Sequence, residues 1–473
     1  YQPVPIKPLA LEMFYQASDA NTYMDVAAGT LSALDVKGGL VADRLLHEPL
    51  YADASYHTLK GALAGQDIQT TSIALSTQTR LDEYETRAQL SYQQLRVHDY
   101  GFNPFLYTHA PATPREAYHT IGFHVSLQPV RPELHELHYR FSVYTGIYTS
   151  SQHAFEWGLR LSMPVDKQIK HDLWIQADIH LQEYVLFTDL PSTRQNFLLC
   201  WKPAATKQIG QLRIRAGLSP ALGEKIYLLP DLRISYPLYN GMLTAEAGLR
   251  GEVQQNTYQQ LTEQNPHLSA YSHMHQTMST RLFGAVSGSV LPGLDYRLQL
   301  AYTLMKQMPV WQSMTYNQHE LWNQFYVSYI SSIKRFEIDA DVRYMLSPNE
   351  EAGLTFGYHP LLGSLPAFTT WYYAASTAGL FVESHPLKKL NARADLFFHG
   401  AASREGSFPV SEAPDHLKAG LDMNLQVHYQ LHPRCILSAY GYNLFNTHYM
   451  PLYQYPQTGI RVSGGCRIQF GTR

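Results

Sequence analysis

The chain has 473 residues and a formal net charge of −3. Only 16% of its residues are charged, against about a quarter in large soluble domains, whereas 12% are aromatic, with 34 tyrosines and 6 tryptophans. The mean hydropathy of −0.26 is too polar for a helical membrane protein, and the near-neutral charge provides no basic face for nucleic acid. A β-barrel wall with one lipid-facing side and one water-facing side would have such a composition and mean hydropathy.

The N-terminal residues 1–21 are expected to form an extended periplasmic segment. Pro3, Pro5 and Pro8 favour extended chain over a packed domain. No signal-peptide pattern is visible, so we expect a signal peptide to have been removed before Tyr1. No run reaches the roughly 18 uncharged apolar residues that a membrane-spanning helix requires.

From Thr22 onward the dominant pattern is an alternation of apolar and polar residues. It is clearest in residues 173–181, 336–344, 421–429 and 459–470. Each run spans about ten residues, the length that a tilted strand needs to cross a bilayer. Strands of soluble sandwiches and propellers are nearer five or six residues, although one such run alone would also fit a half-buried soluble strand. A series along the whole chain favours a membrane barrel.

Short turns alternate with long polar segments between these runs. The expected turns are residues 130–133, 237–241, 291–294 and 431–434, and the expected long loops are residues 101–114, 259–276, 399–415 and 450–457. With that alternation, about 22 strands fit between Thr22 and Phe470, provided that residues 309–334 form an outer excursion. The sequence therefore predicts an all-β fold, in which residues 22–473 form a transmembrane antiparallel β-barrel with long extracellular loops in a Gram-negative outer membrane.

Five segments add a family resemblance. Residues 442–446 (YNLFN), followed by Tyr449, Tyr453, Pro456 and residues 461–470, resemble the closing strands of TonB-dependent outer-membrane receptors of Bacteroidetes. Residues 229–238 and 261–268, together with residues 6–8 and 97–102, look like a plugless subgroup of these barrels. The resemblance implies a TonB-dependent receptor-like barrel without a plug. With about twenty residues before Thr22, the chain alone is not expected to perform TonB-driven import.

No residue is assigned a catalytic role, and no binding residue is singled out. The loop histidines His267, His273 and His275 match no metal-ligand motif, so they are interpreted as solvated, with a metal site as the alternative. A hydrolase would need a triple such as Ser328, His319 and Asn323, but many other triples would serve as well. We expect no cofactor, no metal and no enzyme activity.

Three further groups of residues have both a structural and a functional interpretation. The cysteines Cys200, Cys435 and Cys466 are interpreted as small apolar residues. The rows Arg213 with Arg215 and Arg461 with Arg467 are expected to face a wet lumen, where they could also bind an anionic solute. The aromatic residues near strand ends are expected to form interfacial girdles, with sugar stacking as the alternative; they are Tyr139, Tyr144, Trp157, Trp174, Trp201, Trp322, Tyr326, Trp371, Tyr372 and Tyr373.

Two functions remain open. The first is a structural or accessory subunit of an outer-membrane complex, for protein assembly or surface export, and the alternative is a diffusion channel or a solute-uptake barrel. A lumen of about 22 strands would leak unless loops or a partner close it. Expected partners are outer-membrane lipids, lipopolysaccharide, and another barrel or surface lipoproteins. Trp311, Trp322, Phe325 and Tyr326 form a candidate docking surface, unless they pack inside their loop.

Overall fold

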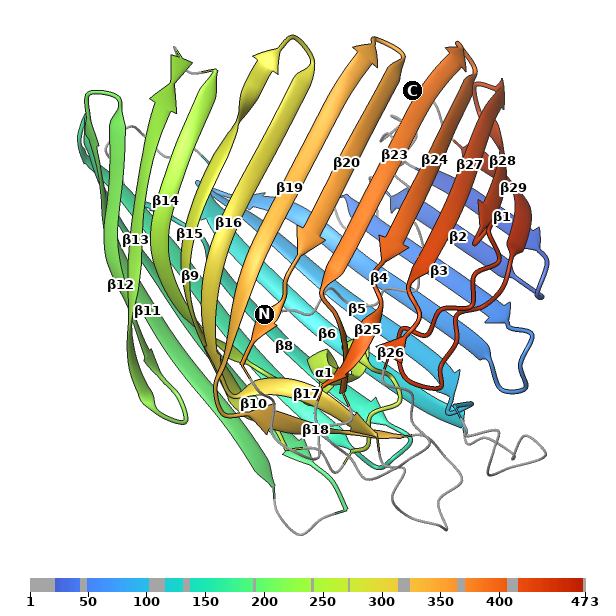
Figure 1. The fold of residues 1–473 in the computed structure, drawn as a ribbon, viewed down its shortest axis with the longest axis horizontal. Coiled ribbons are helices and arrows are strands. Elements are labelled where there is room, and N and C mark those ends of the chain that lie inside the picture. Colours follow the sequence, from blue (N-terminus) through green and yellow to red (C-terminus); the bar gives the residue numbers. More distant parts are fainter. Residues whose placement is uncertain are drawn as a thin grey trace.

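The protein is described here from a computed structural model. It describes residues 22–42, 49–101, 115–130, 137–189, 193–239, 242–270, 273–313, 324–363, 371–405 and 416–470. The expectations for residues 1–21 and 471–473 lie outside these ranges. Figure 1 shows long tilted strands arranged around a central space, with α1 and a small hairpin gathered at the lower end.

The strands form one closed antiparallel ring. Each strand pairs with the next around the sheet, and the ring closes where β1 pairs with β29 over Thr22↔Phe470 to Gly29↔Ser463. The sheet has 24 strands, but β7 (His138–Tyr139) and β21 (Leu361–Leu362) are two-residue strands that pair beside a longer neighbour. The remaining 22 make the barrel, which confirms the predicted fold and strand number.

The bounds of the ring strands agree with the predicted runs. They are β1 (Thr22–Gly29), β2 (Leu34–Ala42), β3 (Leu50–Lys60), β4 (Asp67–Leu81), β5 (Tyr84–His98), β6 (Arg115–Pro129), β8 (Phe141–Ser150), β9 (Phe155–Lys170), β10 (Leu173–Phe187), β11 (Arg194–Ile209), β12 (Leu212–Leu222), β13 (Ile226–Leu238), β14 (Leu243–Gln255), β15 (Gln276–Leu291), β16 (Leu294–Lys306), β19 (Ile333–Ser347), β20 (Glu350–Tyr358), β23 (Ser376–Leu387), β24 (Leu390–His399), β27 (Gly420–His432), β28 (Cys435–Tyr442) and β29 (Arg461–Phe470).

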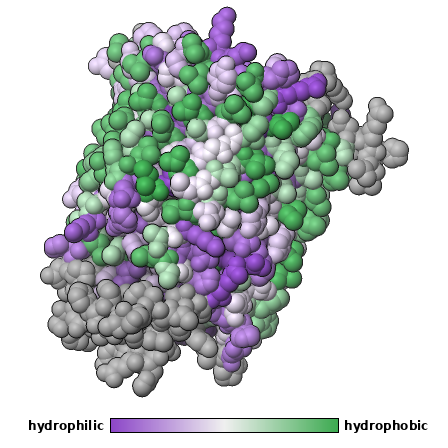
Figure 2. All heavy atoms as spheres, turned by 90° about the vertical axis from the view of Figure 1, so that its right-hand side faces the viewer, coloured by the Kyte–Doolittle hydropathy of each residue, from purple (hydrophilic) through white to green (hydrophobic). Residues whose placement is uncertain are grey.

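The alternation along each strand separates the two sides of the wall. In β19, Phe336 and Ile338 point outward, while Glu337 and Asp339 point into the lumen, where Arg281 of β15 reaches both carboxylates. Because successive side chains of a strand point to opposite faces, one period-two pattern gives an apolar outside and a polar inside. In Figure 2 hydrophobic residues are spread over the visible face with residues of intermediate hydropathy among them, and hydrophilic residues gather at its top and in its lower part.

The two ends of the barrel differ in the length of their connections. At one end β15 ends at Leu291 and β16 begins at Leu294, and β27 ends at His432 and β28 begins at Cys435, which confirms two predicted turns. At the other end residues 256–275, 307–332 and 443–460 connect neighbouring ring strands. We call these the turn end and the loop end; in outer-membrane barrels the short turns face the periplasm and the long loops face outward.

Exposed aromatic side chains form a belt near each end. Near the turn end they are Tyr84, Phe141, Tyr236, Tyr344, Tyr429 and Phe470, and near the loop end they are Phe155, Phe187, Tyr358, Phe398 and Phe445. Such belts mark the two interfaces of a bilayer. No helix of the described ranges is long and apolar enough to cross a membrane.

The predicted girdle residues are only partly correct. Tyr139 fits the turn-end belt, because its hydroxyl donates to that of Tyr84 (3.1 Å). Tyr144 and Trp174 do not fit, because strand register turns both into the lumen, where Arg160 and Arg213 lie over their rings. The remaining predicted residues divide as follows: Trp157 faces outward near the loop end, Trp201 lies in the middle of β11, Tyr326 and Tyr373 lie off the ring, and Trp322 and the side chains of Trp371 and Tyr372 lie outside the described parts.

The remaining elements lie at the loop end. A two-stranded sheet is formed by β17 (Met308–Ser313) and β18 (Phe325–Ile330), and a three-stranded sheet by β22 (Trp371–Ala374), β25 (Ala402–Glu405) and β26 (His416–Leu417). The single helix of the described residues is α1 (Tyr258–Gln264). Because β17 and β18 lie outside the ring, the prediction of an excursion between β16 and β19 is confirmed.

Candidate functional site at the loop end

Loop segments pack together across the loop end of the barrel, and we call them the loop layer. It consists of residues 256–270 with α1, residues 308–313 and 324–330 with β17 and β18, residues 99–101, and residues 449–457. Its apolar core joins these loops to inward-facing residues of the wall. The core residues are Val97, Tyr118, Tyr148, Ala154, Leu186, Tyr258, Leu261, Leu268, Ala270, Trp311, Phe325, Val327 and Tyr455.

The hairpin β17/β18 reaches this layer because the chain bends after β16. Gln307 adopts a left-handed conformation (φ 55°), and the chain then leaves the ring as β17. Met305 and Ile333 of the ring pack against Met308 of the hairpin, and all three are buried. Apolar residues at the bend therefore hold the hairpin at an angle to the wall, and Figure 1 shows it lying across the lower end of the barrel.

Helix α1 begins on a carboxylate of the barrel wall. Glu156, on the lumen side of β9, accepts hydrogen bonds from the backbone N–H groups of Tyr258 (2.6 Å) and Gln259 (3.2 Å). Thr257 caps the same turn, because its hydroxyl accepts from Gln260 N–H (3.1 Å). Three of the orphan donors at the start of the helix thus have partners, and a buried wall residue fixes where the helix begins.

Aromatic residues of the wall support the other side of the helix. The rings of Tyr118 (β6) and Tyr148 (β8) stack with centroids 5.8 Å apart, and Tyr258 meets Tyr148 edge-on. Tyr118 donates its hydroxyl hydrogen to Pro266 O (2.7 Å), and the Tyr148 hydroxyl lies 2.5 Å from that of Thr262. The buried hydroxyl groups are therefore paired with the loop rather than left unsatisfied.

The segment after α1 extends the hairpin sheet. Phe325 N–H donates to His267 O (2.9 Å), and Ser269 N–H donates to Phe325 O (2.7 Å), so Leu268 forms a parallel bridge with Phe325. Two loops that are far apart in the sequence are joined by backbone hydrogen bonds. This pairing makes one continuous surface from α1 to β18.

A buried histidine–carboxylate pair lies at the centre of the layer. Nδ1 of His267 lies 2.8 Å from a carboxylate oxygen of Asp99, and the two side chains are 8% and 0% exposed. The other carboxylate oxygen accepts from the Gln324 side chain (2.9 Å). Three segments that are separate in the sequence therefore meet at one carboxylate, and charge is buried here only because its partners are in place.

Two tyrosines enclose this pair. Tyr455 stacks on the ring of His267 with centroids 3.8 Å apart, and Tyr100 meets both rings edge-on. Burial raises the pKa of Tyr100 to about 12, so that its phenol stays neutral and donates to Pro456 O (3.1 Å). Gln66 donates to the same carbonyl (2.8 Å), which ties the loop after β28 to the loop after β3.

Gly101 is required beside Tyr455, which gives a testable substitution. A Cβ atom at Gly101 would lie 2.5 Å from the Tyr455 ring, closer than real carbon contacts allow. Gly101→Ala is expected to displace Tyr455 from His267 and to destabilise the layer by about 1–3 kcal/mol, as overpacking of a core does. The readout is the protection of the His267 and Leu268 amides from hydrogen exchange.

Gly464→Ala is the matched control, because a Cβ there would meet its nearest neighbour, Ser438 O, only at 3.9 Å. The control should leave protection unchanged. Equal protection in both variants would show that Tyr455 does not hold the layer.

The interpretation of the three loop histidines as solvated is wrong for His267, which is buried. His275 lies at a partly exposed position 3.1 Å from Glu224, and the ring of His273 stacks on that of His275 at 6.4 Å. In the part of the chain that the structure describes, no three His, Cys, Asp or Glu side chains are placed to hold a metal. Loop composition contained no signal for the burial of His267, because its partner Asp99 lies 168 residues away.

The candidate docking surface is also corrected. Trp311 and Phe325 are buried in the layer core, so they pack inside the loop rather than face a partner. Tyr326 alternates to the other face of β18 and is 39% exposed. Trp322 lies outside the described ranges, as do His319 and Asn323 of the hydrolase triple, while Ser328 pairs with Val310 within the hairpin.

The four arginines of the predicted inward rows do face the lumen, each beside a wall partner. Arg215 pairs with Asp231 (2.9 Å), and Arg213 lies over the Trp174 ring. Arg461 lies over Tyr442 and Arg467 over Tyr23, with each guanidinium about 4 Å from the ring centroid. These contacts satisfy the structural interpretation, in which inward charge is balanced within the wall.

The three cysteines are free thiols. Cys200 is buried with Leu198 and Ala221, which agrees with its interpretation as a small apolar residue. Cys435 and Cys466 face outward on the neighbouring strands β28 and β29, with their sulfur atoms 3.5 Å apart. Wide separation in the sequence therefore did not predict the proximity of this pair.

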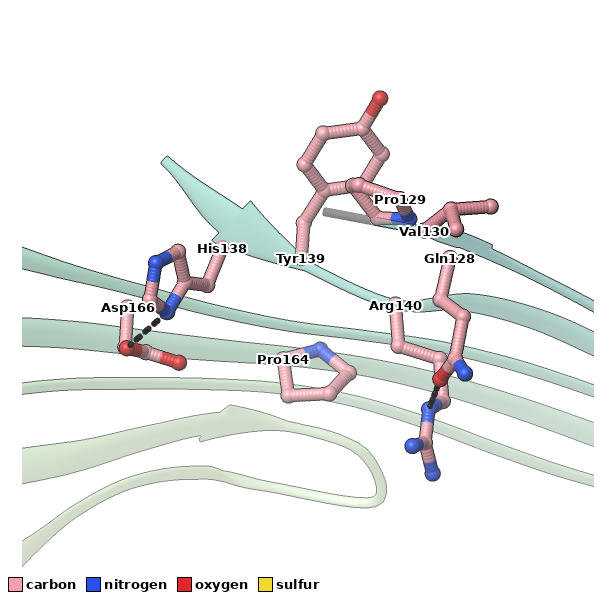
Figure 3. Close-up of a pocket in the computed structure, with 8 residues that line it drawn as sticks. All are labelled: Gln128, Pro129, Val130, His138, Tyr139, Arg140, Pro164 and Asp166. Atoms are coloured by element: carbon pink, nitrogen blue, oxygen red, sulfur yellow. Dashed lines mark hydrogen bonds and ion pairs between the residues drawn. The ribbon is translucent and has the colours of Figure 1, made fainter. Parts of the chain in front are cut away.

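A shallow pocket of about 470 Å³ lies near the turn end (Figure 3). His138 and Asp166 lie on one side of it with 3.4 Å between them, and Arg140 donates to Gln128 (2.9 Å) on the other side. Pro164 lies between these two pairs. The polar groups of this pocket are bonded to one another. The loop layer is therefore the stronger candidate site.

Comparisons with solved structures identify the type of barrel. The FrpB iron transporter from Neisseria meningitidis (F5-1 variant) matches with a TM-score of 0.74 and 9% identity, over 96% of this chain and 83% of that chain. A ferric enterobactin receptor (PfeA) mutant from Pseudomonas aeruginosa matches with a TM-score of 0.72 and 10% identity, over 96% and 81%. The copper transporter OprC matches with a TM-score of 0.67 and 10% identity, over 95% and 82%.

These matches establish the fold: the chain is a closed antiparallel barrel of 22 strands, similar to the barrels of TonB-dependent receptors. Searches by sequence add nothing to this, since no family model and no curated protein matches the chain. The neighbours carry the names of receptors and transporters, which is consistent with the expectation that the chain is not an enzyme. An origin in Bacteroidetes and the lack of a plug stay predictions.

Proposed function

We propose that this chain is an outer-membrane barrel that admits a solute from outside the cell and keeps its outer mouth closed at rest with its own loop layer. The fold supports this, because the similar barrels are receptors and transporters of the outer membrane. The comparisons favour this alternative over the accessory role that we expected first. The observation that carries the proposal is a packed layer at the loop end of a receptor-type barrel.

A layer of loops packed at the loop end argues against permanent free diffusion. The layer is anchored to two separate sectors of the ring: to β5–β10 through its core, and to β16 and β19 through the hairpin. Its residues 449–457, with Tyr455, also belong to the connection between β28 and β29. An uptake barrel with such a layer must move it before a solute passes. The layer is therefore a gate rather than a lining.

Ion conductance tests the gate. Purified wild-type protein in planar bilayers is expected to conduct little, whereas replacement of residues 258–268 by a Gly-Ser linker should raise conductance at least about tenfold, since a lumen of about 22 strands is wide. Replacement of residues 400–401 and 416–419, which lie outside the layer core, is the control. High wild-type conductance, or no gain on removal of α1, would count against a gate.

Uptake itself needs a second experiment. Because the similar structures are named as iron, ferric enterobactin and copper proteins, iron and copper chelates are the first solutes to test in the native host with and without the gene. An accumulation several times lower in the deletion strain supports uptake. Equal accumulation of all of them would exclude these solutes.

A second candidate function is the structural or accessory subunit. It is favoured by the buried His267–Asp99 pair and by the docking of α1 on Glu156, which suit a mouth that stays shut. Mild-detergent purification of the tagged protein from its own membrane decides between the two. Stoichiometric recovery of another barrel or of surface lipoproteins supports the accessory role, and recovery of the barrel alone supports uptake.

A further inference from the structure

The outer surface of β3 to β6 carries a group of cations at the loop end, which we call the cationic rim. Strand register places its residues in rows on the lipid-facing side of the wall. In the first row Lys60 lies opposite Asp67 on the neighbouring strand, and His98 lies opposite Arg115. In the second row Arg96 lies between Gln69 and Ala117. Adjacent strands are about 4.8 Å apart, so the row of four strands spans roughly 15 Å.

The positive charge of the rim is only partly balanced. Asp67 is the one acid on the outward face of the described parts of β3, β4, β5 and β6, and it pairs with His98 (3.1 Å). Arg115 donates to the neutral side chain of Gln69 (3.1 Å). Lys60 and Arg96 form no side-chain hydrogen bond or ion pair with any described residue. Three cations thus share one carboxylate that already has a partner.

The rows beneath the rim change from polar to apolar. The third row is polar: Nδ1 of His119 lies 3.3 Å from the side-chain nitrogen of Gln94 in the same row and 3.0 Å from the hydroxyl of Tyr92 in the next. The following rows carry Ile73 with Ile121, and then Leu90, and these side chains are 45%, 50% and 47% exposed. The cations therefore lie above an apolar outer surface, with one polar row between them, near the depth where the headgroups of the outer leaflet meet their acyl chains.

We propose that the cationic rim binds a phosphorylated glycolipid of the outer leaflet, with its phosphates on Arg96, Arg115 and Lys60 and its acyl chains on the apolar rows below. This inference rests on the proposed outer-membrane location with the loop end outside. A phosphomonoester carries up to two charges and pairs bidentately with arginine. A glycolipid with more than one phosphate therefore matches three cations better than a phospholipid with a single charge.

Binding of fluorescent bisphosphorylated lipid A to the purified full chain in detergent tests the proposal. The double variant Arg96→Gln, Arg115→Gln should bind about 30-fold more weakly than wild type, because each cation beside an anionic surface contributes roughly a factor of five. Lys167→Gln with Lys207→Gln is the control, since these two exposed lysines face outward at the turn end. It removes equal charge and should bind like wild type.

Two further probes separate the possible sources of the effect. Dephosphorylated lipid A should bind wild type no better than the double variant binds the phosphorylated form. Inorganic phosphate at the same concentration should not displace the lipid. Equal binding by wild type and the double variant, or full displacement by phosphate alone, would overturn the proposal, whereas conductance and uptake by the same protein would be unaffected.

Discussion

Asp99→Ala should release the loop layer from the barrel. The substitution removes the acceptor of two side chains in the layer, and each buried polar group left without a partner costs about 1–3 kcal/mol. Here the substitution would leave both His267 and the side-chain amide of Gln324 without the carboxylate that they contact. The backbone pairing of His267 to Ser269 with Phe325 should then open, and the amides of Phe325 and Ser269 should exchange hydrogen at least about a hundredfold faster.

A matched pair provides the control for this prediction. Asp166 also lies beside a histidine, His138, at 3.4 Å, but both side chains are more than a third exposed. Exposed pairs contribute about 0–1 kcal/mol, so Asp166→Ala should leave exchange in the layer unchanged. The double variant Asp99→Leu, His267→Phe should recover part of the protection, because an apolar pair carries no desolvation penalty. Unchanged exchange in Asp99→Ala would refute a central role for the pair.

Glu156→Ala should detach helix α1 from the wall. The substitution leaves the N–H groups of Tyr258 and Gln259 without their acceptor, and each buried unsatisfied donor costs about 1–3 kcal/mol. A helix of seven residues cannot form without such tertiary support. Protease cleavage within residues 258–264 should therefore become at least about tenfold faster, and conductance should rise with it.

Two variants make the Glu156 result specific. Glu156→Gln keeps a carbonyl oxygen that can accept from Tyr258 N–H. The protease should therefore cleave this variant at a rate between those of wild type and Glu156→Ala. Glu183→Ala removes a glutamate from the outward face of the neighbouring strand β10, where it accepts from Gln195 (2.6 Å). It should cleave like wild type. If Glu156→Ala also cleaves like wild type, the wall carboxylate does not position the helix.

Both predictions concern the same question, which is whether the loop layer can move. An uptake barrel needs a layer that a solute displaces, whereas an accessory subunit needs a layer that stays in place. Conductance of the Asp99 and Glu156 variants therefore informs the choice between the two functions. Opening of the pore by a single substitution would show that only a few contacts hold the gate shut.

The wall of the barrel followed from the sequence because its physics is local and repetitive. Apolar and polar residues alternate in Phe336 to Tyr344 and, apart from Trp174, in Leu173 to Leu181. The other apolar residues of these runs face outward in β10 and β19. A bilayer on one side and water on the other impose period two on every strand. The same rule located turns such as the one between Leu291 and Leu294, and hence the strand number.

Errors in the wall prediction came from residues that do not follow this rule. Tyr144 and Trp174 were expected at the interface because they are aromatic, but their register points them into the lumen. An aromatic ring fits a wet lumen as well when an arginine lies over it, as Arg160 does over Tyr144 at 4.1 Å. Residue type alone therefore did not determine the side of the wall, whereas register did.

The sequence by itself determined the barrel: its class, its strand number and its apolar outer face. Only the tertiary structure decided how the loop layer packs on the wall, because the loops have no period and their contacts join distant positions. Asp99 and His267 meet across 168 residues, and Tyr258 reaches Glu156 across 102. The closed ring places β5, β9 and the loop after β14 close to one another, so no local pattern could have revealed these pairs.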